Sequence, residues 1–330
     1  MKPNRSGPFF LKARELVFTK KMIFLILLMG FVLGNWSGYQ SYQYLAKKGC
    51  YPLSSEVISL NLAPSSEGTV RFIALGDVGT ANADQKEVSE GVRQVCESEG
   101  CDFVLLLGDN FMENGITSVH DPLIEKAFEG MYAAIDLPFI PVLGNHDVRR
   151  NVSAQVHYSL LNAKWNMPNY TYQFEVGPAR FFALNTNCNL FGWLPLKDQL
   201  ADDPAKWTFV FGHHPVYSGG VHGDNEWQVR WYWQNFLQER VHFYLSGHNH
   251  HLEHLQMPED PTEYIVSGAG GSHYRSPQDR DRSKPSQAKS RFVYQDTGFA
   301  WMEVSENQVE VKFFDAQGEA IYQFSKERPP

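Results

Sequence analysis

The sequence is poor in cysteine, with only four cysteines in 330 residues. That number excludes the small secreted domains that depend on a dense network of disulfides. Charged residues make up 20% of the chain and hydrophobic residues 43%, and no internal repeat is visible. This balance excludes a disordered tail and a bundle of membrane-spanning helices, and it leaves a globular body of one large or two ordinary domains.

Positive charge is scarce outside the N-terminal region. The first 48 residues hold eight Lys and Arg residues against a single acid, Glu15, and so carry a charge of +7. Because the whole chain carries −8, the remaining residues carry −15. Non-specific nucleic-acid binding draws its affinity from cationic contacts to phosphate, so we expect no nucleic-acid partner for this acidic body.

Long hydrophobic runs are missing except at residues 22–39, which follow a basic segment at residues 1–21. The run is intermediate in length between the core of a signal peptide and a membrane span. No clear cleavage site follows it, and Trp36 and Tyr39 are aromatic residues of the kind that lie at a membrane interface. We expect an uncleaved membrane anchor with the body outside the cytoplasm; secretion after cleavage is the alternative.

In such a location the four cysteines can be oxidised. Cys96 and Cys101 are the favoured pair because they lie across a short turn, residues 97–100, between an expected helix and an expected strand. The alternative is a pair of free thiols packed at the end of the helix. The sequence does not fix the connectivity of Cys50 and Cys188.

The body of the chain alternates between short apolar runs and helical patterns. Residues 40–67 contain several Pro and Ser residues and are interpreted as a linker, residues 68–326 as one domain, and residues 327–330 as a tail. We predict strands at the apolar runs 70–75, 103–107, 139–143, 207–211 and 242–245.

Three helices are predicted from the spacing of apolar residues. Their apolar positions are Val88, Val92 and Val95, then Ile124, Phe128 and Met131, then Trp231, Trp233 and Phe236. The aromatic stripe of the third helix, residues 227–237, is expected to pack in the core rather than to form a ligand platform.

The last sixty residues favour an antiparallel arrangement, since short apolar runs there are joined by tight turns. The expected strands are 264–266, 299–304, 309–314 and 321–324, and residues 276–290 are expected to form a surface loop. The fold class that follows is α/β (α+β), one domain of two packed mixed β-sheets flanked by helices.

Five of the expected strands end in the same way, with an apolar run, a glycine and then a side chain that can bind a metal. The five sequences are Gly76-Asp77-Val78-Gly79, Gly108-Asp109-Asn110, Gly144-Asn145-His146-Asp147, Gly212-His213-His214-Pro215 and Gly247-His248-Asn249-His250. Taken singly, each is explained as a turn, a helix cap or an ordinary histidine. The ordered set is not, because turn formation gives no reason for carboxylates, then an amide, then imidazoles at successive strand ends, where functional groups of α/β sheets gather.

Carboxylate, amide and imidazole ligands together suit Zn, Mn or Fe better than Mg or Ca. Six such side chains are too many for one tetrahedral catalytic site, and a central Asp can bridge two ions. A pair of ions holds a phosphoryl oxygen, neutralises its charge and ionises a water that attacks phosphorus. The sequence therefore predicts hydrolysis of a phosphate ester.

The chain resembles the calcineurin-like metallophosphoesterases, and within them the small purple acid phosphatases of the tartrate-resistant type. The resemblance covers roughly residues 68–326 and is carried by the five strand ends and by segments 144–155, 164–168, 212–218 and 267–270. It implies a four-layered sandwich with a dinuclear metal centre at one edge, and a small phosphorylated substrate.

Carried over by position, the resemblance assigns a role to each residue. Asp77 and His250 hold the first ion, Asp109 bridges, and Asn145, His213 and His248 hold the second. His146 and His222 match the two histidines beside the substrate, and one of them protonates the leaving group; the alternative for His222 is an ordinary loop histidine. His214, His251 and His254 are expected to be groups behind the ligands or on the surface.

Two departures from the family concern the first ion. Purple acid phosphatases have an iron-binding tyrosine three residues after the bridging Asp, where this chain has Met112. Gly79 stands where other metallophosphoesterases have a histidine. We therefore expect a non-purple enzyme with two divalent ions (Fe, Mn or Zn), weaker binding at the first site, to which Glu113 can contribute, and a pH optimum nearer neutrality.

Three functions compete at this point. The first is an extracytoplasmic phosphomonoesterase. The second is a phosphodiesterase or nucleotidase that uses the same metal centre and differs in its pocket walls. The third is a membrane-tethered scaffold that keeps the fold after losing the first metal site, and Met112 is the reason to consider it.

Overall fold

The computed structural model describes residues 47–50, 56–60, 62, 64, 66, 68–188, 190–194, 196–200, 206–273 and 285–328. The chain divides into two units, Met1–Tyr44 and Leu45–Pro330, and every described residue belongs to the second. The basic segment and the expected membrane anchor at residues 22–39 lie outside the described residues. Within the described ranges, no helix combines the length and the apolar character needed to span a bilayer.

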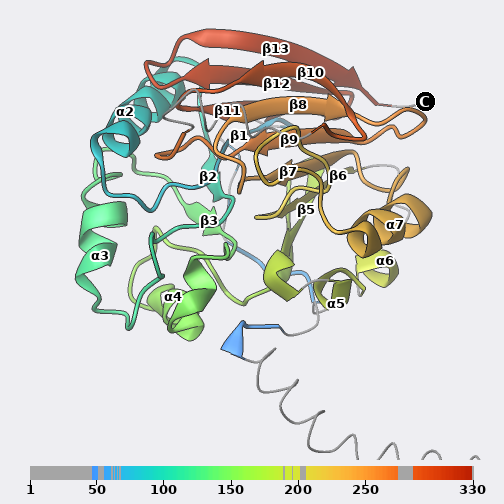
Figure 1. The fold of residues 1–330 in the computed structure, drawn as a ribbon. Coiled ribbons are helices and arrows are strands. Elements are labelled where there is room, and N and C mark those ends of the chain that lie inside the picture. The colour runs from blue at the N-terminus through green and yellow to red at the C-terminus, as the bar shows by residue number, and fades with distance from the viewer. Residues whose placement is uncertain are drawn as a thin grey trace, which may run out of the picture. The chain divides into compact units, whose positions relative to one another are not determined.

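One β-sheet contains six strands over the described residues, in the order β13-β12-β11-β1-β2-β3 (Figure 1). These strands are β1 (Val70–Leu75), β2 (Phe103–Leu106), β3 (Phe139–Pro141), β11 (Gly298–Val304), β12 (Gln308–Asp315) and β13 (Ala320–Glu327). β1, β2 and β3 run parallel to one another, whereas β11 pairs with β1 and the last two strands follow in antiparallel fashion. The parallel strands are buried along nearly their whole length, as expected for strands covered on both faces.

The other sheet contains seven strands in the described part of the chain, in the order β10-β8-β9-β7-β6-β5-β4. These strands are β4 (Tyr172–Val176), β5 (Ala179–Leu184), β6 (Trp207–Gly212), β7 (Phe243–Ser246), β8 (Leu252–Gln256), β9 (Glu263–Ser267) and β10 (Lys289–Tyr294). β5, β6, β7 and β9 are parallel, and antiparallel strands complete both edges.

Aromatic side chains join the two sheets. Phe72 on β1 stacks on Phe103 of β2 at 5.3 Å between ring centroids, and it meets Phe181 and Phe209 of the other sheet edge-on at 5.3 Å and 5.5 Å. All four side chains are fully buried. The predicted architecture of two packed mixed sheets is therefore confirmed.

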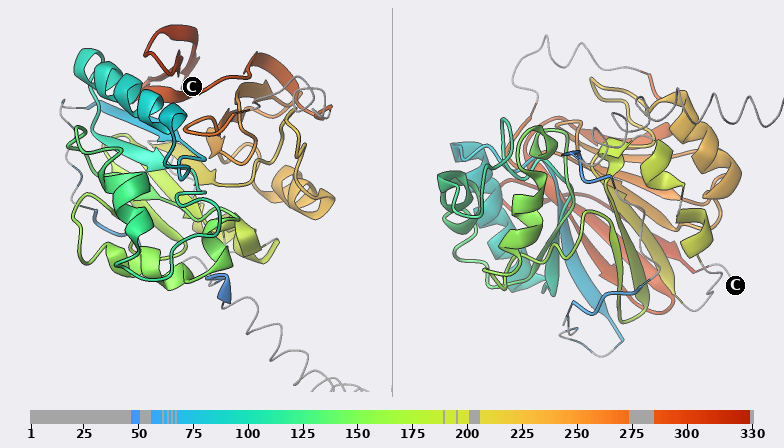
Figure 2. Two further views of the ribbon diagram at one scale, coloured as in Figure 1. Left: turned by 60° about the vertical axis from the view of Figure 1, so that its left-hand side comes forward. Right: turned by 90° about the horizontal axis from the view of Figure 1, so that it is seen from below.

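Helices cover the outer faces of both sheets. They are α2 (Ala83–Ser98), α3 (Pro122–Ile124) with a π-helical extension at Glu125–Glu129, α4 (Val152–Tyr158), α5 (Leu190–Trp193), α6 (Leu196–Gln199) and α7 (Trp227–Phe236). Figure 2 shows α2 to α4 beyond the sheet that contains β1, and α5 to α7 beyond the other sheet. α2 is capped by Asn82 and buries Val88, Val92 and Val95, as its spacing predicted.

The prediction for the third helix was wrong in part. On α7, Trp233 is fully buried, but Trp231 is 51% exposed and Phe236 is 38% exposed. Residues two positions apart on a helix point in nearly opposite directions, so Trp231 and Trp233 cannot share one face. Trp231 instead lies edge-on to Phe236 at 5.7 Å on the outer surface.

Several boundaries also differ from the expectation. β4, β5, β8 and β10 were not predicted. β10 begins at Lys289, inside the expected loop 276–290, of which residues 276–284 lie outside the described residues. Residues of the expected linker contact the fold: the backbone N–H of Ile58 donates to the carbonyl of Gln173 at 2.8 Å. At the other end, β13 extends to Glu327.

Two disulfides join the four cysteines. The Cys96–Cys101 bond closes the turn after α2, which confirms the predicted pair. The Cys50–Cys188 bond, which the sequence left open, ties the segment before the fold to the loop after β5 across 138 residues. This second bond fixes part of the expected linker to the domain.

Candidate metal centre

The six predicted ligands come from both sheets. Asp77, Asp109 and Asn145 follow β1, β2 and β3 of the six-stranded sheet, and His213, His248 and His250 follow β6 and β7 of the seven-stranded sheet. One sheet thus supplies oxygen ligands and the other supplies imidazoles. Since the parallel strands of each sheet end at one edge, the packing of the two sheets brings the two sets together.

Three of these residues have a left-handed backbone. The φ angles are 59° at Asp77, 53° at Asp109 and 68° at His248, which for a residue other than glycine costs on the order of 1 kcal/mol or more. Hydrogen bonds hold these turns: His248 N–H donates to Asp77 Oδ2 at 2.8 Å, and His146 N–H donates to Asp109 Oδ1 at 2.8 Å. The strained backbone of these three residues therefore lies where the proposed ligand side chains approach one another.

The glycines of the strand-end motifs allow the same close approach. A Cβ added at Gly144 would lie 2.1 Å from Asp109 Oδ1, and one at Gly247 would lie 2.6 Å from Asp77 Oδ2. Neither position can carry a side chain without moving a carboxylate. The glycines are needed because the backbone of one motif touches the ligand of another.

His213 lies at the middle of the cluster. Its Nδ1 is 2.9 Å from the carbonyl oxygen of Leu107, so that nitrogen carries a proton and donates. Its Nε2 lies among three further polar atoms: Asn145 Oδ1 at 2.9 Å, His248 Nδ1 at 3.2 Å and Asp109 Oδ2 at 3.3 Å. A positive charge among these atoms, carried by a proton on Nε2 or by a metal ion that replaces it, stabilises their close approach.

The protonation equilibria show the same demand for positive charge. Burial lowers the pKa of His213, but the Asp109 carboxylate outweighs this effect and raises that pKa to about 9. Burial likewise opposes ionisation of Asp109, yet His213 lowers the pKa of Asp109 to about 2. His248 is held neutral because burial and the neighbouring imidazoles depress its pKa, and neutral imidazole is the form that binds metals.

Asp77 and His250 form the other end of the cluster. The Asp77 side chain is fully buried, and its Oδ1 lacks a hydrogen bond of good geometry, with His250 Nε2 3.3 Å away. Burial lowers the pKa of His250, but the Asp77 carboxylate outweighs this effect and raises it, which again favours positive charge between the two groups. A buried carboxylate oxygen without a hydrogen-bond donor is costly unless a cation satisfies it. Ligand atoms of Asp77, Asp109 and His213 all lie within 4.8 Å of one another. The residues present thus fit divalent metal ions, and this observation does not depend on the family resemblance.

Asp147 supports the centre and was not predicted. This buried carboxylate accepts hydrogen bonds from the N–H groups of Asn110, Phe111 and Gly144 at 2.8–3.1 Å, and from Gln155 Nε2 at 2.8 Å. Burial, with the nearby Asp109 charge, raises its pKa to about 7. Asp147 fixes the loop after β2 against the loop after β3. Its position directly after Asn145-His146 was the available signal.

The two histidines predicted beside the substrate each lie next to a different proposed ligand. His146 Nδ1 contacts the carbonyl of Glu113 at 2.6 Å, and its Nε2 is 3.8 Å from Asp109 Oδ2. His222 is exposed and stacks on the His248 ring at 4.1 Å. Both imidazoles are therefore adjacent to proposed ligands and accessible from solvent.

The three histidines that were expected behind the ligands or on the surface, His214, His251 and His254, are not surface groups. His214 Nδ1 is 2.8 Å from Thr186 Oγ1, and burial lowers the His214 pKa to about 3. His251 and His254 are buried beside carboxylates, at 3.0 Å from Glu253 and 2.9 Å from Glu263. These two pairs stabilise the seven-stranded sheet, whereas His214 faces the cavity next to His248.

The departures at the first ion have a structural explanation. A Cβ at Gly79 would lie 2.5 Å from the backbone nitrogens of Phe111 and Met112, so no histidine fits there without a backbone shift. Met112 is half-buried and, with Glu113 and His250, lines a cavity of about 430 Å³ on the His250 side of the centre. The expected first site therefore has space beside Met112, but none for a side chain at position 79.

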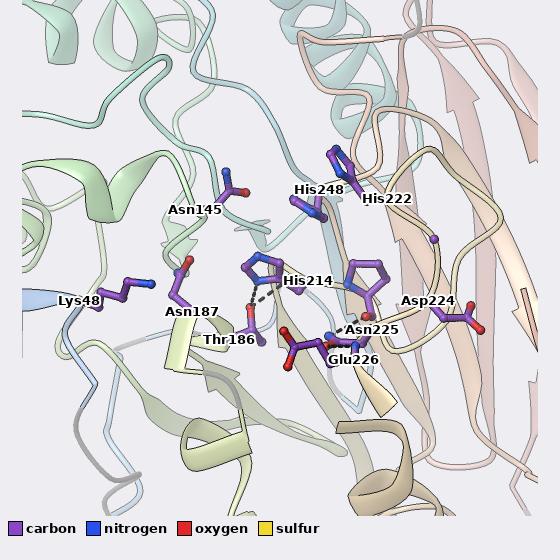
Figure 3. Close-up of a pocket in the computed structure, with 12 residues that line it drawn as sticks. Lys48, Asn145, Thr186, Asn187, His214, His222, Asp224, Asn225, Glu226 and His248 are labelled. Atoms are coloured by element: carbon purple, nitrogen blue, oxygen red, sulfur yellow. Dashed lines mark hydrogen bonds between the residues drawn. The ribbon is translucent and has the colours of Figure 1, made fainter. Parts of the chain in front are cut away.

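A second cavity, of about 290 Å³, opens on the other side (Figure 3). Its lining includes Asn145 and His248 of the cluster, His222, and His214 with Thr186. A cavity of this size beside the proposed second ion can hold a small substrate group.

Comparisons with known proteins agree with this geometry. The calcineurin-like phosphoesterase family model matches residues 70–252. Purple acid phosphatase 3 of Arabidopsis thaliana is 32% identical over 296 residues, which cover 80% of this chain and 80% of the relative. Tartrate-resistant acid phosphatase type 5 of Homo sapiens is 31% identical over 308 residues, which cover 79% and 92%.

A solved structure of similar fold has a different description. GAP50, described as the anchor in the inner membrane complex of Plasmodium, matches with a TM-score of 0.69 at 26% identity and covers 80% of this chain and 90% of that chain. The chain is thus similar both to phosphatases and to a protein described as an anchor.

Proposed function

This chain belongs to the calcineurin-like phosphoesterase family, and we propose that it hydrolyses phosphomonoesters with two divalent metal ions. The observation that carries the proposal is the convergence on His213 Nε2 of Asp109, Asn145 and His248, a set of side chains that fits a divalent ion. Asp77 and His250 are proposed to hold the first ion, Asp109 both ions, and Asn145, His213 and His248 the second.

Divalent ions in such a site neutralise phosphoryl oxygens and lower the pKa of a water that attacks phosphorus. The chain orients the ligands: Leu107 holds the His213 ring by its Nδ1, and Asp147 holds the backbone next to Asp109. His146 or His222 donates the proton that the leaving alkoxide requires, since both lie beside the cluster.

The first ion is proposed to bind more weakly than the second. Gly79 and Met112 supply no ligand, so Asp77, Asp109 and His250 hold it with water or Glu113. Without a phenolate to stabilise ferric iron, both ions are divalent and the protein has no purple colour. A divalent ion acidifies water less than a trivalent ion does, so the pH optimum lies closer to neutrality.

A second function, a scaffold without catalysis, is favoured by one observation. The chain shares its fold with GAP50, which is described as an anchor. A phosphodiesterase would use the same centre and differ only in which esters it accepts.

Hydrolysis by the full chain distinguishes these functions. We expect release of phenol from phenyl phosphate in the presence of Mn²⁺, Zn²⁺ or Fe²⁺, and at least about tenfold slower hydrolysis of methyl phenyl phosphate. The His213→Asn variant should lose about a hundredfold or more in kcat, because it loses a proposed ligand. His157→Asn is the control, since this exposed residue lies on α4 outside the cluster. Faster hydrolysis of the diester would indicate a phosphodiesterase, and no hydrolysis of either ester would indicate the scaffold.

The location is a separate proposal. The basic segment followed by the apolar run 22–39 supports an anchor that leaves the catalytic unit outside the cytoplasm. Extraction of membranes with alkaline carbonate should leave the full chain in the membrane fraction, and release into the soluble fraction would favour the secreted form.

A further inference from the structure

The cavity beside the proposed second ion has a lysine that the family pattern does not assign. Lys48 lines this cavity together with Asn187 and His214. In Figure 3 its side chain extends toward Asn187, from the side of the cavity that lies away from Asp224. Among the described residues that line the cavity, Lys48 is the only Lys or Arg.

Lys48 belongs to the segment that precedes the first strand, yet this segment is fixed at the cavity. Asn185 Nδ2 donates to the carbonyl oxygens of Lys48 at 2.8 Å and of Gly49 at 3.1 Å. Gly49 is buried, has a φ of 68°, and lies so close to Tyr170 that an added Cβ would be 2.7 Å from the ring. These contacts hold the backbone from which the Lys48 side chain extends.

The Cys50–Cys188 disulfide links two segments that line the same cavity. Cys50 comes two residues after Lys48, and Cys188 comes directly after Asn187. The bond therefore sets the distance between the lysine segment and the loop after β5. A disulfide that only stabilised the fold would not need to join two segments that both line this cavity.

The lining of the cavity also includes two acidic residues, Asp224 and Glu226. Asp224 is engaged elsewhere: its carboxylate accepts hydrogen bonds from Ser218 N–H at 3.0 Å and Ser286 Oγ at 2.6 Å, and it pairs with Arg230 at 3.4 Å. Glu226 is exposed. The ammonium of Lys48 thus adds a positive charge to the side of the cavity that Asn187 lines, away from Asp224 (Figure 3).

On the basis of the proposed function, we propose that this cavity receives the leaving group of the substrate and that Lys48 binds an anionic group carried by that leaving group. The ions would neutralise the phosphoryl group that is transferred, so a further cation on another wall serves a second anionic group, a carboxylate or a second phosphate. The preferred substrates are phosphomonoesters with such a group, and the disulfide holds Lys48 in the position that selects them.

Matched aryl esters test this selection in the full chain. For Lys48→Ala we expect kcat/KM to fall about tenfold, mainly through KM, for 4-carboxyphenyl phosphate and for 1,4-phenylene bisphosphate, since a charged hydrogen bond is lost. Hydrolysis of phenyl phosphate should change less than twofold. Lys48→Arg should retain most of the preference. Lys47→Ala is the control, because Lys47 is the exposed neighbour on the same segment. A loss that is equal for all three esters would overturn the proposal.

The disulfide is tested with the same esters. The Cys50→Ser, Cys188→Ser double variant should show the substrate-selective loss of Lys48→Ala, whereas the Cys96→Ser, Cys101→Ser variant should not. If only one of the two charged esters responds to Lys48→Ala, that result identifies whether carboxylate or phosphate is bound, and it supports the proposal.

Binding provides a readout that does not depend on turnover. Calorimetry should show that the native chain binds 4-carboxybenzylphosphonate about tenfold more tightly than benzylphosphonate, and that Lys48→Ala removes this difference. If no ester is hydrolysed but the difference in binding remains, the proposed function fails and the anion site stands. Equal binding of both phosphonates by the native chain would contradict the anion site, whatever the activity.

Discussion

Nε2 of His213 lies 3.3 Å from Oδ2 of Asp109, although His213 follows β6 in one sheet and Asp109 follows β2 in the other. The contact exists only when the two sheets are packed through their shared aromatic layer. The candidate centre is therefore a product of tertiary structure, and no single segment can form it. Metal analysis and unfolding measurements should therefore distinguish substitutions that affect the centre from substitutions that affect the stability of either sheet alone.

Gly79→Ala tests the steric account of the first departure. A Cβ at this position meets backbone nitrogens at 2.5 Å, so we expect a loss of about 1–3 kcal/mol in the free energy of unfolding from overpacking. Gly79→His should be at least as destabilised and should bind no more metal than the native chain. Denaturant titration and metal analysis provide the two measurements. A stable Gly79→His variant with higher metal content would show that the site could accept the histidine.

Met112→Tyr tests the second departure and has the opposite expectation. Met112 borders a cavity of about 430 Å³ that also contacts His250, so a larger ring has space there. After loading with Fe³⁺ the variant should show a visible absorption band from phenolate-to-iron charge transfer, and the native chain should not. Met112→Phe is the matched control, because it adds the ring without the phenolate. A visible band in the native protein would contradict the assignment of a non-purple centre.

Trp233→Ala and Trp231→Ala compare two tryptophans on α7. Trp233 is fully buried and packs against the rings of Trp193 and Tyr244, so its loss should cost about 3–5 kcal/mol. Trp231 is 51% exposed, and its loss should cost less than about 1 kcal/mol. Urea unfolding of the two variants measures both values. Similar losses would mean that the aromatic stripe is a single core face after all.

The sequence predicted some elements of the fold and missed others. β1, with its run of buried apolar residues, was predicted at its observed bounds, and the presence and buried face of α2 were predicted from valines at helical spacing. β4 and β8 were missed because their alternating polar residues, such as Gln173 and Glu253, are buried through side-chain pairing that the pattern does not reveal. Burial of such residues depends on partners distant in sequence.

The candidate site shows the same limit. Its six proposed ligands could be named from the sequence because each follows a glycine at a strand end. Asp147 was missed because its role is to accept backbone N–H groups from a loop 37 residues earlier. Lys48 was missed because only the packing of its segment and the Cys50–Cys188 bond bring it to the cavity.

His242 should make the stability of the fold depend on pH. Burial, together with Lys326 and Arg328, lowers the His242 pKa from 6.5 to about 4, and its Nδ1 accepts the N–H of Thr208 at 3.0 Å. The unfolded chain therefore binds the proton more readily, and stability falls as the pH decreases from about 6.5 to 4. At pH 5 the loss attributable to this group is about 2 kcal/mol.

His242→Asn provides the test, because asparagine keeps an acceptor and does not titrate. The difference in unfolding free energy between pH 7 and pH 5 should be smaller in this variant than in the native chain by about that amount. Measurements in excess chelator exclude effects of metal loss. An unchanged pH dependence would mean that another group is responsible.

The central claim is that two divalent ions bind where Asp77, Asp109, Asn145, His213, His248 and His250 converge. The most direct test is the metal content of the folded full chain by elemental analysis after loading with Mn²⁺ or Zn²⁺ and removal of free metal. Two ions per native chain, and one or fewer in Asp109→Asn, are the predicted result. A folded native chain that retains no ion, or an Asp109→Asn variant that retains two, would contradict the claim.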